Sequence, residues 1–294
     1  MSEFIIETRN LSRAFNGTQA VRDFNLRVRR GSIYGFLGRN GAGKTTAIKL
    51  LVGLLRVDAG EVRVLGKDPW DFTVEDRQRV GYLSEKQTLM PGMRVDALIE
   101  FTSTFYPNWD GTMCERVLQR FKLDPKKRIK ELSGGQQRQV GFLLALAQRP
   151  DLLILDEPAA SLDAVARREF LEEVLALLRE EGKTVLFSSH ILSDVERIAD
   201  EIGIMAGGTL KLSEPLDRLK ETVKQVRFHS FASGTDGFTV PDAFRLAKTP
   251  TEALVTLRLT DETTLPKLAA QHRCQFEVCH LGLEDIFIEL VRES

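Results

Sequence analysis

A glycine-rich segment near the N-terminus carries the residue types that bind phosphate. It has Gly38, Gly41 and Gly43 followed by Lys44 and Thr45, and so matches the pattern Gly-x-x-x-x-Gly-Lys-Thr. The glycines let the backbone curl, so that successive N–H groups point at a bound anion. The lysine then reaches the β- and γ-phosphates, and the threonine hydroxyl can bind Mg²⁺. The candidate phosphate-binding residues are Gly38, Arg39, Asn40, Gly41, Ala42, Gly43, Lys44, Thr45 and Thr46.

The flanking segments favour a nucleotide site over a glycine turn without a ligand. Residues 33–37 form a short apolar run typical of a strand, and residues 46–51 continue as a predicted helix. The positive end of this helix reinforces the anion site. Because strand, loop and helix follow one another in the required order, the sequence predicts a nucleoside triphosphate site.

Two further predicted strands end in residues suited to hydrolysis. Residues 152–155 are apolar and lead into Asp156 and Glu157, as expected of a buried parallel strand that delivers acid groups to its C-terminal edge. Asp156 suits a Mg²⁺ shell, and Glu157 suits polarising an attacking water. The strand at 184–189 ends at His190, for which the alternative is an ordinary structural histidine.

A third motif indicates the class of nucleotide-binding protein to which the chain is similar. Residues 132–138 read Leu-Ser-Gly-Gly-Gln-Gln-Arg and precede a predicted helix with an apolar stripe. With these motifs in this order, the chain resembles the ATP-binding subunit of an ABC transporter over roughly residues 3–215. Its C-terminal segment 283–290 resembles the last helix of the ATPase subunits that serve ABC-2-type exporters.

The resemblance implies a dimer that shares its nucleotide sites. Ser133, Gly134 and Gly135 begin a helix whose free N–H groups need an anion. In the family this anion is the γ-phosphate of ATP bound to a second ATPase subunit, in a homodimer or heterodimer. Asp163 is then expected to signal across the dimer interface.

The resemblance also assigns roles within one subunit. Lys44 and the loop amides hold the phosphates, while Thr45 and Asp156 hold Mg²⁺. Glu157 acts as base or orients the water, and His190 contacts the γ-phosphate. The cofactors implied are therefore ATP and Mg2+.

Phe15 and Glu85 are two further candidate nucleotide-site residues that the resemblance singles out. Phe15 lies where the family carries an aromatic residue that stacks on adenine, although a core residue of an edge strand is the alternative. Glu85 occupies the stretch where most members carry a glutamine that touches Mg²⁺ and the attacking water, and Gln87 follows two residues later. A carboxylate can still bind Mg²⁺, directly or through water, but adds negative charge near the γ-phosphate.

The predicted fold class is α/β. It comprises a phosphate-loop ATPase core with an antiparallel β subdomain, an inserted helical subdomain at about 86–150, and a small C-terminal α+β appendage. The proposed domains are 1–218 and 219–294. In the helical subdomain, Leu98, Phe101, Thr102 and Phe105 are expected to share one face.

Composition limits the partners and the compartment. The 41 Lys and Arg residues balance 42 Asp and Glu residues, so the bulk charge does not indicate nucleic acid as a partner. The N-terminus has no signal-peptide pattern, and no apolar run approaches the roughly 20 residues that a spanning helix needs. We therefore expect a cytoplasmic protein, peripheral on the inner face of the cell membrane, with separate membrane-spanning permease subunits.

The cysteines add little to the functional prediction. The chain has three, an odd count that predicts reduced thiols. Histidine and cysteine do cluster near the C-terminus, but their spacing matches no zinc pattern. The clustered residues are His272, Cys274, Cys279 and His280.

The function predicted from these motifs is an ATP-hydrolysing transporter subunit that closes as a dimer on ATP and drives substrate movement, with export favoured. The alternative is a soluble ABC ATPase that acts on nucleic acid, ribosomes or iron–sulfur assembly. The sequence shows no sustained heptad run and one phosphate loop, which disfavours the DNA-repair and translation types.

Overall fold

The computed structural model describes residues 3–160, 162–232, 234–241, 243–259, 261, 263–279 and 281–291, without the side chains of 290 and 291. The chain forms two compact units, Met1–Ser213 and Glu214–Ser294. The predicted boundary after residue 218 therefore falls inside helix α8 (Leu216–Thr222), which belongs to the second unit.

A six-stranded sheet forms the centre of the first unit. Its order is β10-β9-β4-β8-β7-β6, and the pairs among β4, β6, β7, β8 and β9 are parallel. Every residue of β4, β7, β8 and β9 is buried, as strands covered on both faces require. The strands are β4 (Ile33–Leu37), β6 (Val80–Leu83), β7 (Leu152–Leu155), β8 (Thr184–Ser189), β9 (Glu201–Ala206) and β10 (Thr209–Pro215).

The sheet explains how distant motifs meet. In a parallel sheet the C-terminal ends of the strands lie at one edge. The phosphate loop follows β4, Glu85 follows β6, Asp156 follows β7 and His190 follows β8. Helix α7 (Leu192–Ile198) packs on β4 and β8, and helix α6 (Ala164–Glu181) contacts α7.

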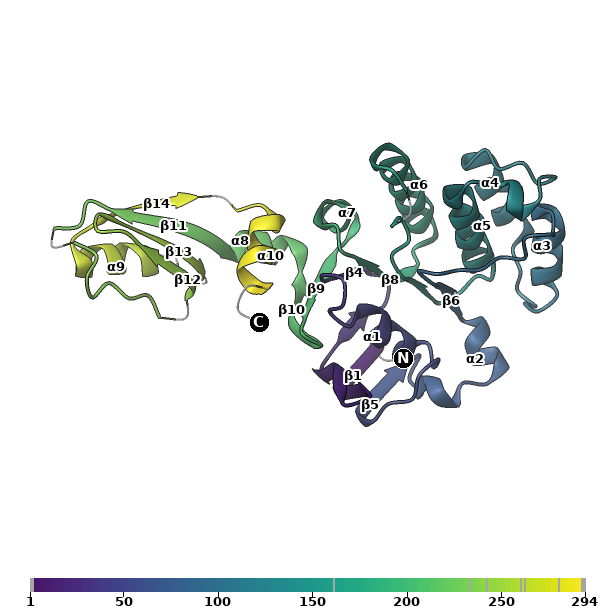
Figure 1. Cartoon of the computed structure of the whole chain (residues 1–294), viewed down its shortest axis with the longest axis horizontal. Helices are drawn as coiled ribbons and strands as arrows, with labels where there is room; N and C mark the ends of the chain where they lie inside the picture. The colour runs from purple at the N-terminus through teal and green to yellow at the C-terminus, as the bar shows by residue number, and fades with distance from the viewer. Residues whose placement is uncertain are drawn as a thin grey trace. The chain divides into compact units, whose positions relative to one another are not determined.

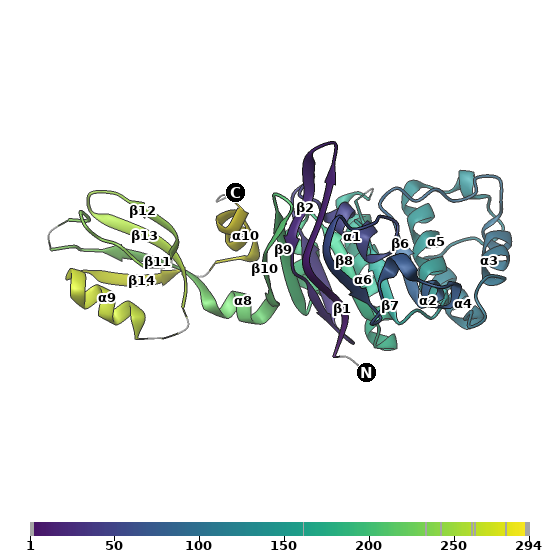
Figure 2. The same cartoon turned by 90° about the horizontal axis from the view of Figure 1, so that it is seen from below.

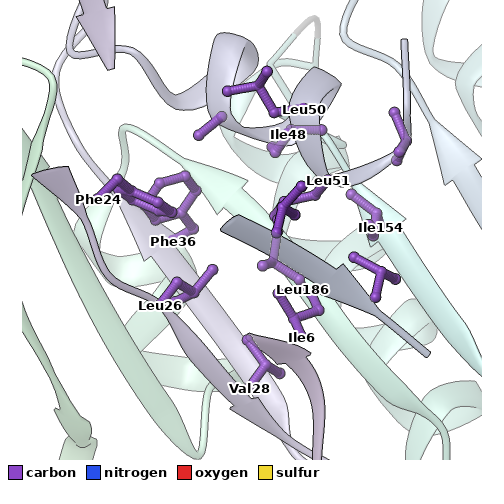
Figure 3. Packing of buried hydrophobic residues seen from close by; sticks show 14 of the residues in the cluster. Ile6, Phe24, Leu26, Val28, Phe36, Ile48, Leu50, Leu51, Ile154 and Leu186 are labelled. Atoms are coloured by element: carbon purple, nitrogen blue, oxygen red, sulfur yellow. The ribbon is translucent and has the colours of Figure 1, made fainter. Parts of the chain in front are cut away.

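A smaller antiparallel sheet covers helix α1 (Lys44–Leu51). It contains β1 (Phe4–Phe15), β2 (Thr18–Phe24), β3 (Arg27–Arg29) and β5 (Ala59–Val64), and Figure 2 shows β1 and β2 side by side. Phe24, Leu26 and Val28 are buried, while Asn25, Arg27 and Arg29 between and after them are polar, as a strand with one buried face requires. The core that the three buried residues form with α1 and the central sheet is shown in Figure 3.

The predicted helical segment is confirmed as a group of helices within the first unit (Figure 1). The expected shared face is wrong: Leu98 is buried, but Phe101 and Phe105 are 43% and 57% exposed. Helix α3 ends at Ser103, so Phe105 lies in the following turn, with its ring against Phe101. The short helices of this region and of the segment before it are η1 (Pro69–Asp71), α2 (Val74–Gln78), α3 (Val95–Ser103), α4 (Gly111–Arg120), η2 (Ile129–Glu131) and α5 (Gly134–Ala147).

The second unit is a four-stranded antiparallel sheet with helices, which agrees with the predicted α+β texture. The sheet order is β12-β13-β11-β14, and Val226, Phe228 and Phe238 lie in its core. The ring of His272 packs on Phe238, and Cys274 packs on the same core. Of the clustered histidines and cysteines, His280 lies outside the described residues. The elements are α8, β11 (Val223–His229), β12 (Ala243–Lys248), β13 (Glu252–Arg258), α9 (Thr264–His272), β14 (Gln275–Cys279) and α10 (Leu283–Val291).

Candidate nucleotide site

The phosphate loop requires glycine for steric reasons. Gly43 has φ of 106°, and a Cβ atom there would lie 2.3 Å from the Ala20 carbonyl oxygen. At Gly38 a Cβ would lie 2.7 Å from the Met205 carbonyl oxygen. No side chain caps helix α1, which begins directly after Gly43. The first N–H groups of the helix are therefore left for an anion.

Lys44 is held inside the loop. Its side chain is only 5% exposed, and Nζ donates to the Gly38 carbonyl oxygen at 2.7 Å. Nζ also lies 3.2 Å from Oε1 of Glu157, whose side chain is 9% exposed. A buried cation needs such partners, because an unpaired charge in the interior is strongly destabilising.

Asp156 presents an oxygen that suits a cation. Its Oδ1 accepts from Ser188 Oγ at 2.7 Å and from Thr45 Oγ1 at 3.4 Å. Its Oδ2 is buried and has no hydrogen-bond partner among the described residues. Burial raises the pKa of Asp156 above its ordinary value, and the negative charges of Glu85 and Glu157 raise it further. The hydrogen bonds from the Ser188 and Thr45 hydroxyls lower it in part.

Glu157 is held by its backbone and by its side chain. Its φ is 47°, and its N–H donates to Ser188 Oγ at 2.9 Å. Its Oε2 lies 2.9 Å from His190 Nδ1. Because an ionised carboxylate only accepts hydrogen bonds, we assign the proton of a neutral His190 to Nδ1. Nε2 then remains available to a bound ligand.

Lys44, Glu157 and His190 border one open cleft. Glu85 belongs to its lining, whereas Gln87 has its side-chain oxygen 1.9 Å from where a Cβ on Gly141 would lie and so packs against helix α5. Glu85 is therefore the residue of this loop that faces the phosphate site. The cleft is lined by Ala20, Arg39, Asn40, Gly41, Gly43, Lys44, Thr45, Thr46, Glu85, Glu157, Ala160 and His190.

The Ser-Gly-Gly turn lies in another place. Ser133 Oγ accepts from the Gln136 N–H at 3.2 Å, and Gln136 Oε1 accepts from the Ser133 N–H at 3.1 Å, which caps α5. Ser133, Gly134 and Gly135 line a second open cleft together with Asp163, whose side chain caps α6. Among the residues that the structure describes, the two linings have no member in common. A single chain thus does not bring this turn to its own phosphate loop.

Comparisons with known proteins agree with this geometry. Residues 21–160 match the family model described as ABC transporter. The chain is 33% identical over 217 residues to the ABC transporter ATP-binding protein YtrB of Bacillus subtilis (strain 168), covering 74% of each chain. It is also 33% identical over 219 residues to the bacitracin transport ATP-binding protein BcrA of Bacillus licheniformis, covering 74% of this chain and 72% of the relative.

A solved ATP-binding subunit of an ABC transporter superposes with a TM-score of 0.65 at 26% identity, covering 74% of this chain and 92% of that chain. The chain belongs to the ABC transporter ATP-binding family. It is an ATP-binding and ATP-hydrolysing subunit of an ABC transporter. The match to this solved structure also confirms the predicted fold class. In the described part of the chain, no helix is long and apolar enough to cross a membrane.

Other positions that family resemblance singled out lie apart from the cleft lining. Phe15 ends β1 and is 41% exposed, which contradicts the alternative of a core residue. The Arg13 guanidinium lies 4.9 Å from its ring centroid. Ala42 is buried, and its carbonyl oxygen accepts from the Gly208 N–H.

Sequence reasoning missed four residues in or beside the cleft. Ala20 lines the cleft from β2 and Ala160 lines it three residues after Glu157, and nothing in their type indicated this. Ser188 links Asp156 to Glu157, and its position two residues before His190 was the available signal. Arg138 follows the Ser-Gly-Gly-Gln turn and bonds to the Glu157 carbonyl oxygen.

Proposed function

We propose that this chain binds Mg·ATP between its phosphate loop and the Ser-Gly-Gly turn of a second ATPase subunit, hydrolyses it, and thereby drives export through separate membrane subunits. The observation that carries the proposal is the separation of two half-sites. Lys44 and Glu157 border one cleft, and Ser133 borders another. The first cleft has the phosphate-loop residues without the Ser-Gly-Gly turn, and the second has the turn without the phosphate loop.

Within one subunit, the contacts suggest how the residues divide the work. Lys44 and the uncapped N–H groups of α1 bind the phosphates. Glu157 accepts a proton from the attacking water, and His190 Nδ1 holds that carboxylate while Nε2 faces the γ-phosphate. ATP must draw Lys44 from Glu157, so binding also frees the carboxylate for its role.

The residues present fit a hard divalent cation. The unpartnered Oδ2 of Asp156 and the Thr45 hydroxyl are oxygen donors of the type that Mg²⁺ prefers, and Glu85 adds a carboxylate to the cleft that Thr45 lines. When bound, Mg²⁺ would neutralise phosphate charge.

The nucleotide base and the dimer interface complete the proposal. The exposed ring of Phe15 offers a face for adenine, with Arg13 behind it. Asp163 lies beside the Ser-Gly-Gly turn in the same cleft, where it can respond to a nucleotide bound by the partner. Domains 1–218 and 219–294 remain our proposed functional division.

The proposed export direction rests on the resemblance of segment 283–290 to the last helix of ABC-2-type exporter ATPases. The relatives named as transport ATP-binding proteins support transport, and they disfavour the alternative of a nucleic-acid, ribosome or iron–sulfur ATPase. We place the chain in the cytoplasm, on the inner face of the membrane through its permease. Affinity purification in detergent should recover an integral membrane protein in constant ratio. Recovery of ribosomal or nucleic-acid components alone would support the alternative.

Complementation tests the shared sites. Ser133→Arg blocks the turn with a bulky cation, and Glu157→Gln removes the base. Each variant alone should be inactive. In a mixed dimer, the phosphate loop of the Ser133→Arg subunit faces the intact turn of the Glu157→Gln subunit, which regenerates one working site.

Activity of the mixture should therefore exceed that of either variant and peak near equal amounts. The control is a mixture of Ser133→Arg with Ser133→Arg/Glu157→Gln, in which every site is damaged. If the first mixture stays inactive although mixed dimers are shown to form, the shared-site model is wrong.

A further inference from the structure

Arg138 is a buried arginine that joins three parts of the ATPase core. It lies on α5, one turn beyond the Ser-Gly-Gly turn, and is 7% exposed. Its Nη1 donates to the Ser84 carbonyl oxygen at 2.5 Å, and its Nη2 donates to the Glu85 carbonyl oxygen at 2.7 Å. The same Nη2 donates to the Glu157 carbonyl oxygen at 3.2 Å. Arg138 is not part of the nucleotide-cleft lining.

The third of these bonds reaches an unusual piece of backbone. Glu157 has φ of 47°, in the left-handed region that a residue with a Cβ rarely adopts. Such a conformation persists only where the surroundings fix it. Its N–H donates to Ser188 Oγ, and its carbonyl oxygen accepts from Arg138 and from the Ala160 N–H. Both peptide groups of the catalytic candidate are thus anchored.

The chemistry of the guanidinium explains why arginine suits this position. Its donors lie in one plane in fixed directions, so that one side chain can bond to carbonyl oxygens from two chain segments. An ammonium group on a lysine is a compact charge and cannot span the same acceptors in fixed directions.

We propose that Arg138 is a positioning residue that fixes the backbone of Glu157 for hydrolysis and couples it to the Ser84–Glu85 loop through helix α5. The inference rests on the proposed role of Glu157 as the base. A displacement of α5 would pull the Glu85 loop and Glu157 together, because one side chain holds both. Arg138 itself touches no substrate.

The experiment compares Arg138→Gln and Arg138→Lys with wild type and Glu157→Gln, all as full chains. We expect Arg138→Gln to lower kcat on the order of 10²-fold, as a misplaced catalytic group does. KM and the ATP Kd should stay close to wild type, because Arg138 does not line the cleft. Arg138→Lys should recover part of kcat. The control, Arg79→Gln, removes an exposed ion pair with Asp151 and should leave kcat unchanged.

Two readouts separate positioning from a purely structural role. An ATP-bound dimer should accumulate for Arg138→Gln, as for Glu157→Gln, if only the base is misplaced. Loss of that dimer, or a raised KM with a lowered Tm, would instead show that Arg138 supports the Ser-Gly-Gly turn or the fold, and would overturn the proposal.

Failure of the inference differs from failure of the proposed function. If Glu157→Gln keeps turnover, the assignment of the base is wrong. If Glu157→Gln is inactive but Arg138→Gln keeps wild-type kcat, the positioning role is wrong. Should Arg138→Gln not fold, Arg138→Lys decides the case: a lowered kcat at unchanged KM supports positioning, and a wild-type kcat refutes it.

Discussion

Replacing Glu157 with glutamine separates binding from hydrolysis. The substitution keeps the shape of a side chain that lies 2.9 Å from His190 Nδ1 and 3.2 Å from Lys44 Nζ, but removes its charge and basicity. Loss of a general base costs about 10²–10⁴-fold in rate, or about 3–5 kcal/mol. We expect kcat to fall by that factor.

ATP binding should respond in the opposite direction. At 3.2 Å the Lys44–Glu157 attraction is about 5 kcal/mol before desolvation, at an effective dielectric constant of 20. A charged hydrogen bond contributes about 1.5–3 kcal/mol net. Because ATP no longer competes with Glu157 for the lysine, its Kd should fall, by up to about tenfold.

The nucleotide-free Glu157→Gln variant should be less stable than wild type. Lys44 keeps its bond to the Gly38 carbonyl oxygen but loses its counter-charge, which should lower the Tm of the nucleotide-free variant. ATP should restore it by a larger shift than in wild type. Calorimetry gives the Kd, scanning fluorimetry the Tm, and size-exclusion chromatography with Mg·ATP should show an accumulated dimer. Turnover within tenfold of wild type, or ATP affinity lost together with turnover, would refute the reasoning.

Three other substitutions test neighbouring assignments. Lys44→Ala should weaken ATP binding by about 1.5–3 kcal/mol, and an unchanged calorimetric Kd would contradict the phosphate role. Asp156→Asn should raise the Tm of the Mg²⁺-free protein at neutral pH, because a raised pKa of Asp156 means that its ionised carboxylate destabilises the fold. The gain in Tm should vanish as the pH falls below the ordinary aspartate pKa of about 3.9, and a gain independent of pH would argue against this cause. Phe15→Ala should weaken ATP by about 1–3 kcal/mol and leave tripolyphosphate affinity unchanged, whereas equal losses for both ligands would exclude stacking on adenine.

The sequence alone determined the elements that deliver chemistry. Asp156 follows β7 directly, His190 follows β8, and the phosphate loop that contains Lys44 follows β4. The C-terminal ends of parallel strands gather at one edge of a sheet. Local order along the chain is therefore enough to predict that these side chains meet. Leu26 and Val28 alternate with Arg27 and Arg29 in the sequence and are both buried, because side chains alternate between the two faces of a strand.

The tertiary structure decided what depends on direction and on long-range packing. Phe101 and Phe105 continue a helical pattern in sequence, but the helix ends between them and both rings are exposed. Gln87 turns toward α5 while Glu85 faces the cleft, a choice set by the space beside Gly141. These outcomes follow from neighbours far along the chain, which a local pattern does not contain.

The division of the site was decided in the same way. The sequence could associate the Ser-Gly-Gly turn with a phosphate, but only the folded chain shows that this turn and the phosphate loop line different clefts. In the sequence, Arg138 is only the last residue of the motif before a predicted helix, and the fold brings the Ser84 and Glu157 carbonyl oxygens to it. Backbone acceptors carry no sequence signature, since every residue has one, and their position is a property of the tertiary structure alone.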